Sequence, residues 1–332
     1  MPKILIVGDT LSERDTETGV PFSDGAGSIL HGILRQAGVP KEDVTFTTVI
    51  PERIRIDDIL TNVPAEAVPG WPTYAPRLSL HSRYALALAD FTALRTGLAP
   101  DVIVALGDLA LWALTHQRGF AKYRGTVLPT FDGLHKVIPT WHPTTIIKQW
   151  DLRVIALLDI QKALRQSAFP EIRRPQRNVR LAPTLADIES FYHEHIVLAP
   201  LLGVDIETKA NQITEIGFAA SPSEALVIPF WSRGTRDGNY WPTKAEELAA
   251  WKWVRRILAE KRYVGQNFQY DMTYLYKRMG IPSPGFAGDT MLLHHAMQPE
   301  LKKSLGFLGS IYTDEPSWKF MREGADTLKK ED

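Results

Sequence analysis

The stretch that decides the fold of the second half is residues 201–208, which read LLGVDIET. Its apolar residues predict a largely buried strand. Side chains alternate between the two faces of a strand, so Asp205 and Glu207 point the same way. Neighbouring carboxylates repel each other unless a cation offsets their charge, and hard divalent cations prefer such oxygen ligands. The stretch therefore predicts a cation site at one end of a strand.

A second polar motif, residues 263–276, reads YVGQNFQYDMTYLY. Asn267 and Asp271 are four residues apart, which places them on one face of a predicted helix. Aromatic residues flank Asp271, an unusual setting for a charge that only contacts solvent. The alternative for this motif alone is an Asn helix cap followed by an ordinary surface Asp.

The two halves of the chain have different patterns. In the first half, buried apolar runs at 4–7 and 102–106 each end at a glycine and alternate with helical patterns, which is typical of an α/β fold with a parallel sheet and helices on both faces. In the second half, residues 201–206, 212–219 and 225–230 predict an antiparallel meander, followed by a helix from about residue 243, hence a mixed-sheet domain. We expect domains at 1–167 and 181–332, joined by a basic linker at 168–180 that is either solvated or touches nucleic acid.

Two polar motifs follow strands in the first half. Asp9 closes the first strand before the glycine-rich loop 19–27, GVPFSDGAG, and His142 follows the last strand in TWHPTT. Ligands bind beyond the carboxyl ends of strands in open α/β sheets, so we expect Asp9 and His142 to lie close together. A generic strand-to-helix loop and a structural His are the alternatives for each motif taken alone.

Composition limits the possible function classes. A chain of 332 residues with 44% hydrophobic and 23% charged residues is typical of a globular protein with two domains. The net charge of +0 argues against a mainly electrostatic nucleic-acid binder but allows a local basic groove. Because there is no cysteine, disulfides, thiolate zinc sites and cysteine-bound iron–sulfur clusters are excluded. No apolar run approaches the roughly 20 residues of a membrane span, and no signal peptide is predicted, so we expect a cytoplasmic protein (the host cytoplasm if it is phage-encoded) without membrane contact.

Residues 185–332 resemble the DEDD superfamily of 3′–5′ exonucleases, especially the proofreading domain of phage-type family A DNA polymerases. The two carboxylate motifs match in order and spacing, and so do DTMLLHH at 289–295 and the stretch 303–316. The resemblance implies a ribonuclease-H-like domain in which Asp205, Glu207 and Asp271 hold two Mg²⁺ or Mn²⁺ ions about 4 Å apart around the scissile phosphate.

The same resemblance implies roles for three further residues. Asn267 would position a single-stranded 3′ end of DNA, and Phe268 or Tyr270 would stack on its terminal base, with core packing as the alternative for at least one of them. Duplex DNA is a further expected substrate. Trimming of RNA is an alternative, because selection against the 2′-OH depends on pocket shape.

One element of that family is missing from the sequence. The third motif has a Tyr or His four residues before a final Asp, and neither Asp326 nor Asp332 has such a partner. The chain stops about where the helix that carries this motif should begin. We expect the sequence to be the N-terminal piece of a longer polymerase, or a split-gene product, with weak or absent nuclease activity by itself.

Residues 3–165 resemble family 4 uracil-DNA glycosylases. The matching motifs, in order, are residues 7–9, 19–22, 25–27, 100–107, 123–125 and 141–143. The resemblance implies that Phe22 stacks on a flipped base, that Asp9 positions the hydrolytic water and that His142 binds the base carbonyl.

This sequence departs from the glycosylase family in three ways. The family has Glu where Asp9 stands, and it holds a four-cysteine iron–sulfur cluster. Its uracil-reading Asn falls near Thr48, whose hydroxyl cannot present the paired donor and acceptor of an amide. Together the resemblances imply a DNA replication or repair component that binds DNA and a polymerase domain or subunit. The alternative is a non-catalytic DNA-binding or assembly module that docks on a polymerase.

Overall fold

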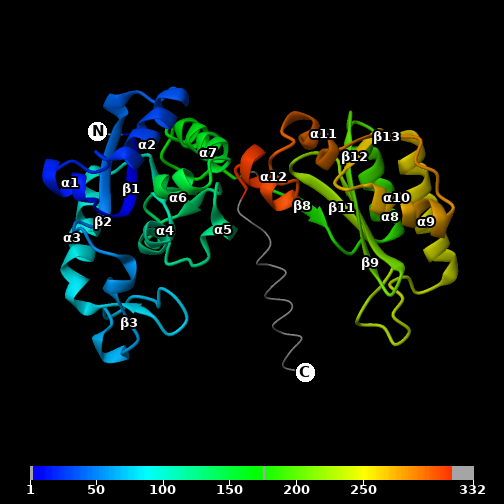
Figure 1. The fold of residues 1–332 in the computed structure, drawn as a ribbon. Helices are drawn as coiled ribbons and strands as arrows, with labels where there is room; N and C mark the ends of the chain where they lie inside the picture. The colour runs from blue at the N-terminus through cyan, green and yellow to red at the C-terminus, as the bar shows by residue number, and fades with distance from the viewer. Residues whose placement is uncertain (1–2, 175, 316–332) are drawn as a thin grey trace. The chain divides into compact units, whose positions relative to one another are not determined.

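The computed structural model describes residues 3–174 and 176–315, which form two compact units. Unit 1 contains the described residues up to 173 together with 306–315, and unit 2 contains 174–305. Each unit has its own sheet and its own helices (Figure 1). This division differs from the expected domains, because residues 306–315 pack on unit 1 rather than on the unit that precedes them in the chain.

A five-stranded sheet forms the centre of unit 1, with the strand order β2-β1-β5-β7-β6. The strands are β1 (Ile4–Thr10), β2 (Val44–Ile50), β5 (Val102–Leu106), β6 (Leu128–Pro129) and β7 (Lys136–Thr140). β1, β2, β5 and β7 are parallel, as predicted, and β6 adds an antiparallel edge. Every residue of β5 is buried, because helices cover both faces of the sheet.

Successive residues of β1 and β5 face different helix layers. Leu5, Val7 and Ile103 share a core with α3 (Ala85–Leu98) and α4 (Asp108–Thr115). On the other side, α2 (Gly25–Gln36), α6 (Pro143–Lys148) and α7 (Leu152–Gln166) contact one another, and α7 contacts β5 and β7. Smaller elements complete the unit: α1 (Glu13–Thr18), α5 (Phe120–Tyr123), and the hairpin of β3 (Leu60–Thr61) and β4 (Ser79–Leu80).

Unit 2 contains a six-stranded mixed sheet with the order β13-β12-β9-β10-β11-β8. The strands are β8 (Asn178–Arg180), β9 (Leu202–Lys209), β10 (Gln212–Ala219), β11 (Glu224–Pro229), β12 (Tyr263–Gly265) and β13 (Phe286–Asp289). β9, β10 and β11 form the predicted antiparallel meander, while β8, β12 and β13 are parallel to their neighbours. The end of the expected linker is instead a strand, because residues 178–180 pair with the open edge of β11.

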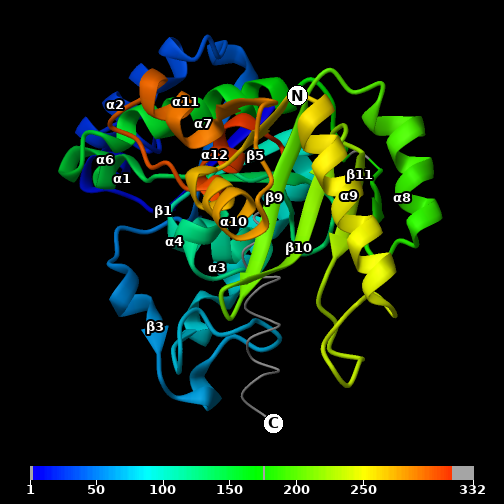
Figure 2. The same ribbon diagram turned by 90° about the vertical axis from the view of Figure 1, so that its right-hand side faces the viewer.

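Three helices cover one face of this sheet: α8 (Leu185–Phe191), α9 (Lys244–Glu260) and α10 (Gln269–Met279) (Figure 2). The Thr243 hydroxyl accepts from the Glu246 backbone N–H at 3.2 Å, which confirms the predicted start of α9. Outside this layer, α11 (Thr290–Met297) follows β13. Among the described residues, no helix is both long and apolar enough to cross a membrane.

A buried lysine attaches the segment 306–315 to unit 1. This segment contains most of α12 (Leu305–Tyr312). The Lys162 ammonium donates to the carbonyl oxygens of Gly125 at 2.7 Å and Thr313 at 2.6 Å, and also to that of Ser310. Burial lowers the pKa of Lys162 to about 8, and the carbonyls at the end of α12 offset part of the cost of burying the charge.

A buried carboxylate completes the same network. Asp159, on α7, accepts from the Arg124 guanidinium at 2.6 Å and from the Thr140 hydroxyl at 2.7 Å. The Arg124 guanidinium also donates to the Ser310 hydroxyl and lies 5.1 Å from the centre of the Phe307 ring. One acidic side chain thus connects α7 and the end of β7 with the segment 306–315.

Replacement of Asp159 by Ala should destabilise unit 1 by about 3–5 kcal/mol, because Arg124 would then be buried without its carboxylate. Chemical denaturation of both variants in the full chain measures the difference. The matched control is Asp151→Ala, at the exposed start of the same helix, where the side chain makes no capping hydrogen bond. Equal stability of the two variants would contradict the assigned role of Asp159.

Candidate functional sites

Asp9 lies where β1 leaves the sheet of unit 1. Its Oδ1 accepts from the Ala110 N–H at 2.9 Å, near the start of α4. Gly107 has φ +96°, and a Cβ there would lie 3.0 Å from Asp9 Oδ2, so the carboxylate requires glycine at this position. Burial raises the pKa of Asp9 to about 7; the Ala110 N–H opposes this shift, and the negative charge of Asp108 adds to it.

Phe22 forms a wall beside this carboxylate. A Cβ on Gly8 would lie 2.6 Å from the Phe22 ring, so the ring packs directly on the backbone of β1. Phe22 has φ +61°, in the left-handed region, and its ring is 5.8 Å from that of Phe46 and 6.3 Å from that of His142. Only 6% of Phe22 is exposed, so the ring is held in place before any ligand arrives.

His142 precedes α6, and its protonation state follows from its hydrogen bonds. Nδ1 accepts from the Thr144 backbone N–H at 3.3 Å and lies 2.7 Å from the Thr144 hydroxyl oxygen. Burial lowers the pKa of His142 to about 4, so the imidazole is neutral at physiological pH. Because Nδ1 uses its lone pair as an acceptor, the proton lies on Nε2, which can donate to a ligand.

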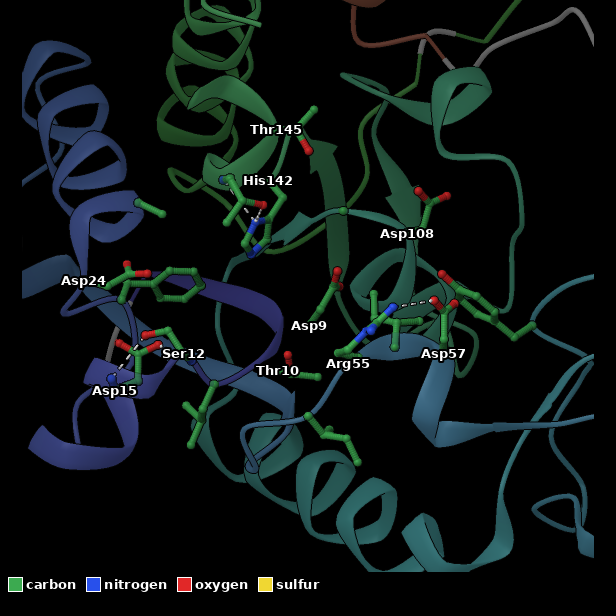
Figure 3. Close-up of a pocket in the computed structure, with 18 residues that line it drawn as sticks. Asp9, Thr10, Ser12, Asp15, Asp24, Arg55, Asp57, Asp108, His142 and Thr145 are labelled. Atoms are coloured by element: carbon green, nitrogen blue, oxygen red, sulfur yellow. Dashed lines mark hydrogen bonds and ion pairs between the residues drawn. The ribbon is translucent and has the colours of Figure 1, made fainter. Parts of the chain in front are cut away.

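The structure brings Asp9, Phe22 and His142 together around a pocket of about 550 Å³. Figure 3 shows the His142 ring and the Asp9 carboxylate directed into the same space, between Asp24 and Asp108. The expected proximity of Asp9 and His142 is therefore observed, while their chemical roles stay predictions.

The pocket lining includes residues that sequence reasoning did not identify, among them Tyr74 and Asp108. Burial and the charges of Asp108, Asp9 and Asp57 raise the pKa of Tyr74, which stays a neutral hydrogen-bonding group. Tyr74 lies in a loop whose sequence shows no periodic pattern that would have marked it.

Thr48, near the position where the glycosylase resemblance places a base-contacting residue, does not face the pocket. Thr48 is buried, and its hydroxyl donates to the Ile50 carbonyl at 3.0 Å. The side chain is thus committed to its own strand and is not part of the pocket lining.

In unit 2, Asp205 and Asp271 lie next to each other at the edge of β9. β12 pairs with β9 only as far as Gly203, which leaves the N–H of Ile206 without a strand partner on that side. Asp271 Oδ1 accepts this N–H at 2.9 Å. Burial raises the pKa of Asp271 to about 7, and the nearby charges of Asp205 and Asp289 add to the shift. A cation would relieve this crowding, so the pair suits a hard divalent ion.

Glu207 lies on the same exposed face of β9 as Asp205 but opposite Glu215 of β10. Burial and the charge of Glu207 raise the pKa of Glu215, a carboxyl group that sequence reasoning did not include because only the strand register reveals it. Within the described ranges 3–174 and 176–315, no three His, Asp or Glu side chains form a group that could hold a metal ion. The expected grouping of Asp205, Glu207 and Asp271 is therefore reduced to the pair Asp205 and Asp271.

Before α10, the helix face expected of Asn267 and the substrate contact expected of Phe268 need correction. Asn267 has φ +55° and precedes the helix, so it does not share a helix face with Asp271. Phe268 is fully buried and stacks on Phe286 at 5.2 Å, so it is a core residue and offers no ring to a base. Tyr270 is 46% exposed and remains available. The late aspartates considered for a third motif, Asp326 and Asp332, lie outside the described residues.

Asp289 fixes the turn that places these residues. Its carboxylate accepts from the backbone N–H groups of Asn267 at 3.0 Å, Phe268 at 2.8 Å and Met291 at 2.8 Å. It caps α11 and at the same time holds the left-handed turn at Asn267. The DTMLLHH motif contains this residue, but the sequence gives no sign that it reaches back to the turn before α10.

Comparison with known families agrees with the site in unit 1. The sequence profile of the uracil DNA glycosylase superfamily matches residues 1–169. The chain therefore belongs to the uracil DNA glycosylase superfamily. In particular, it is similar to the type-4 uracil-DNA glycosylase of Thermotoga maritima, with 32% identity over 165 residues, covering 48% of this chain and 76% of that protein.

A second relative is similar over most of the chain. A DNA polymerase of Bacillus phage SP01 is 22% identical over 324 residues, which cover 88% of this chain. The chain spans 32% of the length of that polymerase. Two solved structures are also similar. Trypanosoma brucei RNase D in complex with GMP has a TM-score of 0.34 and 16% identity over 45% of this chain and 46% of that one. The EXD2 exonuclease domain soaked in Mn and GMP has a TM-score of 0.27 and 17% identity over 42% and 70%.

The raised pKa of Asp9 predicts how stability depends on pH. Unfolded Asp ionises near pH 3.9 and folded Asp9 near 7, so the native state holds its proton more tightly and loses stability as pH rises between these values. Asp9→Asn removes this loss. The free energy of unfolding of the variant, relative to that of the unchanged protein, should therefore rise by roughly 2–3 kcal/mol from pH 5 to pH 8. Urea unfolding at both pH values measures the gain. The control is Asp90→Asn, at an exposed position on α3. A pH-independent difference between the Asp9 variant and the unchanged protein would contradict the assignment.

Proposed function

We propose that this chain is a DNA replication or repair component whose unit 2 is a divalent-cation-dependent 3′–5′ exonuclease and whose unit 1 binds an extruded nucleobase. The observation that carries the exonuclease proposal is the pair Asp205 and Asp271 at the unpaired edge of β9. The similarity to a phage DNA polymerase supports a proofreading-type role and a polymerase domain or subunit as partner.

The proposed phosphodiester hydrolysis in unit 2 uses carboxylates on β9 and α10, a divalent cation and one aromatic ring. Asp205 and Asp271 would hold a Mg²⁺ or Mn²⁺ ion, which supplies an activated water and offsets the charge of the scissile phosphate. Glu207 lies two residues further along the same face of β9 and would contribute once a phosphate and cation draw it toward the pair. Tyr270 is held beside β9 by its 2.6 Å hydroxyl contact with Thr208 and offers a ring to the terminal base.

Single-stranded DNA labelled at its 5′ end should be shortened from its 3′ end in the presence of Mn²⁺. Asp205→Ala should slow this digestion by about a hundredfold or more, because a ligand of the ion is lost. Gel analysis of time courses measures the rate, with an all-RNA strand beside it to test discrimination at the 2′-OH. Glu189→Ala, at an exposed acidic position on α8, is the matched control. Digestion that persists without added cation, or at full rate in the Asp205 variant, would refute the proposal.

The pocket of unit 1 supports recognition of a base outside the duplex. Phe22 would stack on the base, and His142 Nε2–H would donate to a base carbonyl. Asp9, when ionised, would position and deprotonate a water for attack at the sugar carbon, with the base as leaving group and His142 stabilising its developing charge. The turned-away hydroxyl of Thr48 favours the second candidate, a base-binding module that does not excise uracil.

A uracil-containing oligonucleotide followed by alkali separates these two functions. If unit 1 excises uracil, cleavage should increase about tenfold per pH unit below pH 7 and level off above it, because only ionised Asp9 can accept the proton. His142 should add no further pH dependence above pH 5, since it remains neutral there. Asp9→Ala and His142→Ala should abolish cleavage, whereas Asp90→Asn should not. Two outcomes would exclude excision by this pocket and leave it only base binding. Either the unchanged protein does not cleave, or cleavage survives in both pocket variants.

A further inference from the structure

A cavity of unit 2 lies at the C-terminal end of β9, beyond the carboxylates. It has a volume of about 710 Å³ and lies next to the tight turn at 210–211 that joins β9 to β10. Its lining includes two tryptophans, two basic residues and several amides and acids. They are Trp231, Trp251, Lys209, Arg278, Asn211, Gln212, Asn239, Asp237 and Glu247.

The aromatic wall of this cavity is held in place without a ligand. Trp251 stacks on Phe230, with the ring centres 3.8 Å apart and the planes 14° from parallel. Trp231 is half-buried, and a Cβ on Gly238 would lie 3.1 Å from its Nε1, so the loop packs closely against the edge of the indole. The Lys209 ammonium lies 4.0 Å from the centre of the Trp231 ring. A fixed indole beside a mobile cation is the combination that single-strand-binding proteins use for a base and its phosphate.

An aromatic stripe on α10 connects the carboxylates with this cavity. Tyr270, Tyr274 and Arg278 are spaced by four residues and share one helix face. The rings of Tyr270 and Tyr274 are 4.9 Å apart. Tyr270 contacts Thr208, and the Tyr274 hydroxyl donates to the Asn211 side-chain oxygen at 3.3 Å, so the stripe follows β9 to the turn. Arg278, one turn further, lines the cavity itself.

The charges of the lining indicate which part of a single-stranded nucleic acid would enter the cavity. Lys209 and Arg278 stand at the cavity, where they can pair with phosphates outside it. Glu247 also lines it, so a phosphate inside would face a carboxylate, whereas a base can donate its exocyclic amino group to one. Asp237 is already engaged, because it accepts from both nitrogens of Asn239. The lining therefore fits a base better than a phosphate.

We propose that this cavity binds an unpaired nucleobase of the single strand whose 3′ end lies at Asp205 and Asp271, an inference that rests on the exonuclease function proposed above. Asp205 and Lys209 are four residues apart on β9, or roughly 13 Å at about 3.3 Å per residue. A stacked strand advances about 3.4 Å per nucleotide, so the bound base is about four nucleotides from the 3′ end. The cavity thus makes strand length a determinant of binding.

Fluorescence anisotropy in EDTA measures binding without digestion. The probes are oligo-deoxyadenylates of three and eight nucleotides, labelled at the 5′ end. The eight-nucleotide probe should bind about tenfold or more tightly than the three-nucleotide probe, because only it reaches Trp231. Trp231→Ala should remove this difference, and Trp231→Phe should retain most of it. Tyr276→Ala is the control, since Tyr276 is an exposed aromatic residue on α10 that does not line the cavity, and it should leave both affinities unchanged.

Two further variants separate this inference from the exonuclease proposal. Lys209→Ala changes an exposed side chain and should weaken binding of the longer probe even if Trp231→Ala fails to fold. Asp205→Ala should lose digestion in Mn²⁺ but keep the length dependence of binding. Equal affinity for the two probes in the unchanged protein, or full length dependence in both the Trp231 and Lys209 variants, would overturn the cavity assignment. Loss of length dependence in those variants, with no digestion by any protein, would support the cavity and count against the exonuclease.

Discussion

Both candidate sites depend on a carboxylate that accepts a backbone N–H left without a partner in its own helix or sheet. Asp9 accepts from Ala110 at the start of α4, and Asp271 accepts from Ile206 at the unpaired edge of β9. In each case burial outweighs the hydrogen bond, and the pKa rises to about 7. A group held in this way is fixed in position and can change its charge near neutral pH, which is what acid–base sites require.

In the pocket of unit 1, the backbone determines where the charged and aromatic side chains can lie. Gly107 allows the carboxylate of Asp9 to approach, and Gly8 lets the Phe22 ring lie on β1. His142 caps α6 with Nδ1, and this local hydrogen bond leaves Nε2–H for a ligand. Membership of the uracil DNA glycosylase superfamily agrees with this arrangement, while the engaged hydroxyl of Thr48 distinguishes the chain from a pocket that reads uracil through an amide.

The segment 306–315 belongs to unit 1 because of charge. Lys162 and Arg124 are buried cations, and carbonyl and hydroxyl groups of this segment complete their hydrogen bonding beside Gly125 and Asp159. The chain therefore leaves unit 1, builds unit 2 and returns to unit 1. Asp159 supports both this return and the end of β7, which leads to His142, so one buried acid stabilises the surroundings of the unit 1 site.

The sequence by itself determined the element types, the parallel and mixed sheets, the meander of β9 to β11 and the proximity of Asp9 to His142, because these follow from local apolar patterns and from the ends of parallel strands. It did not determine where Phe268 points, which is into the core. Nor did it identify Tyr74, Glu215, Asp289 or the return of residues 306–315. Those features depend on strand register and on the pairing of buried charges between segments far apart in the chain, and only the tertiary structure brings such segments into contact.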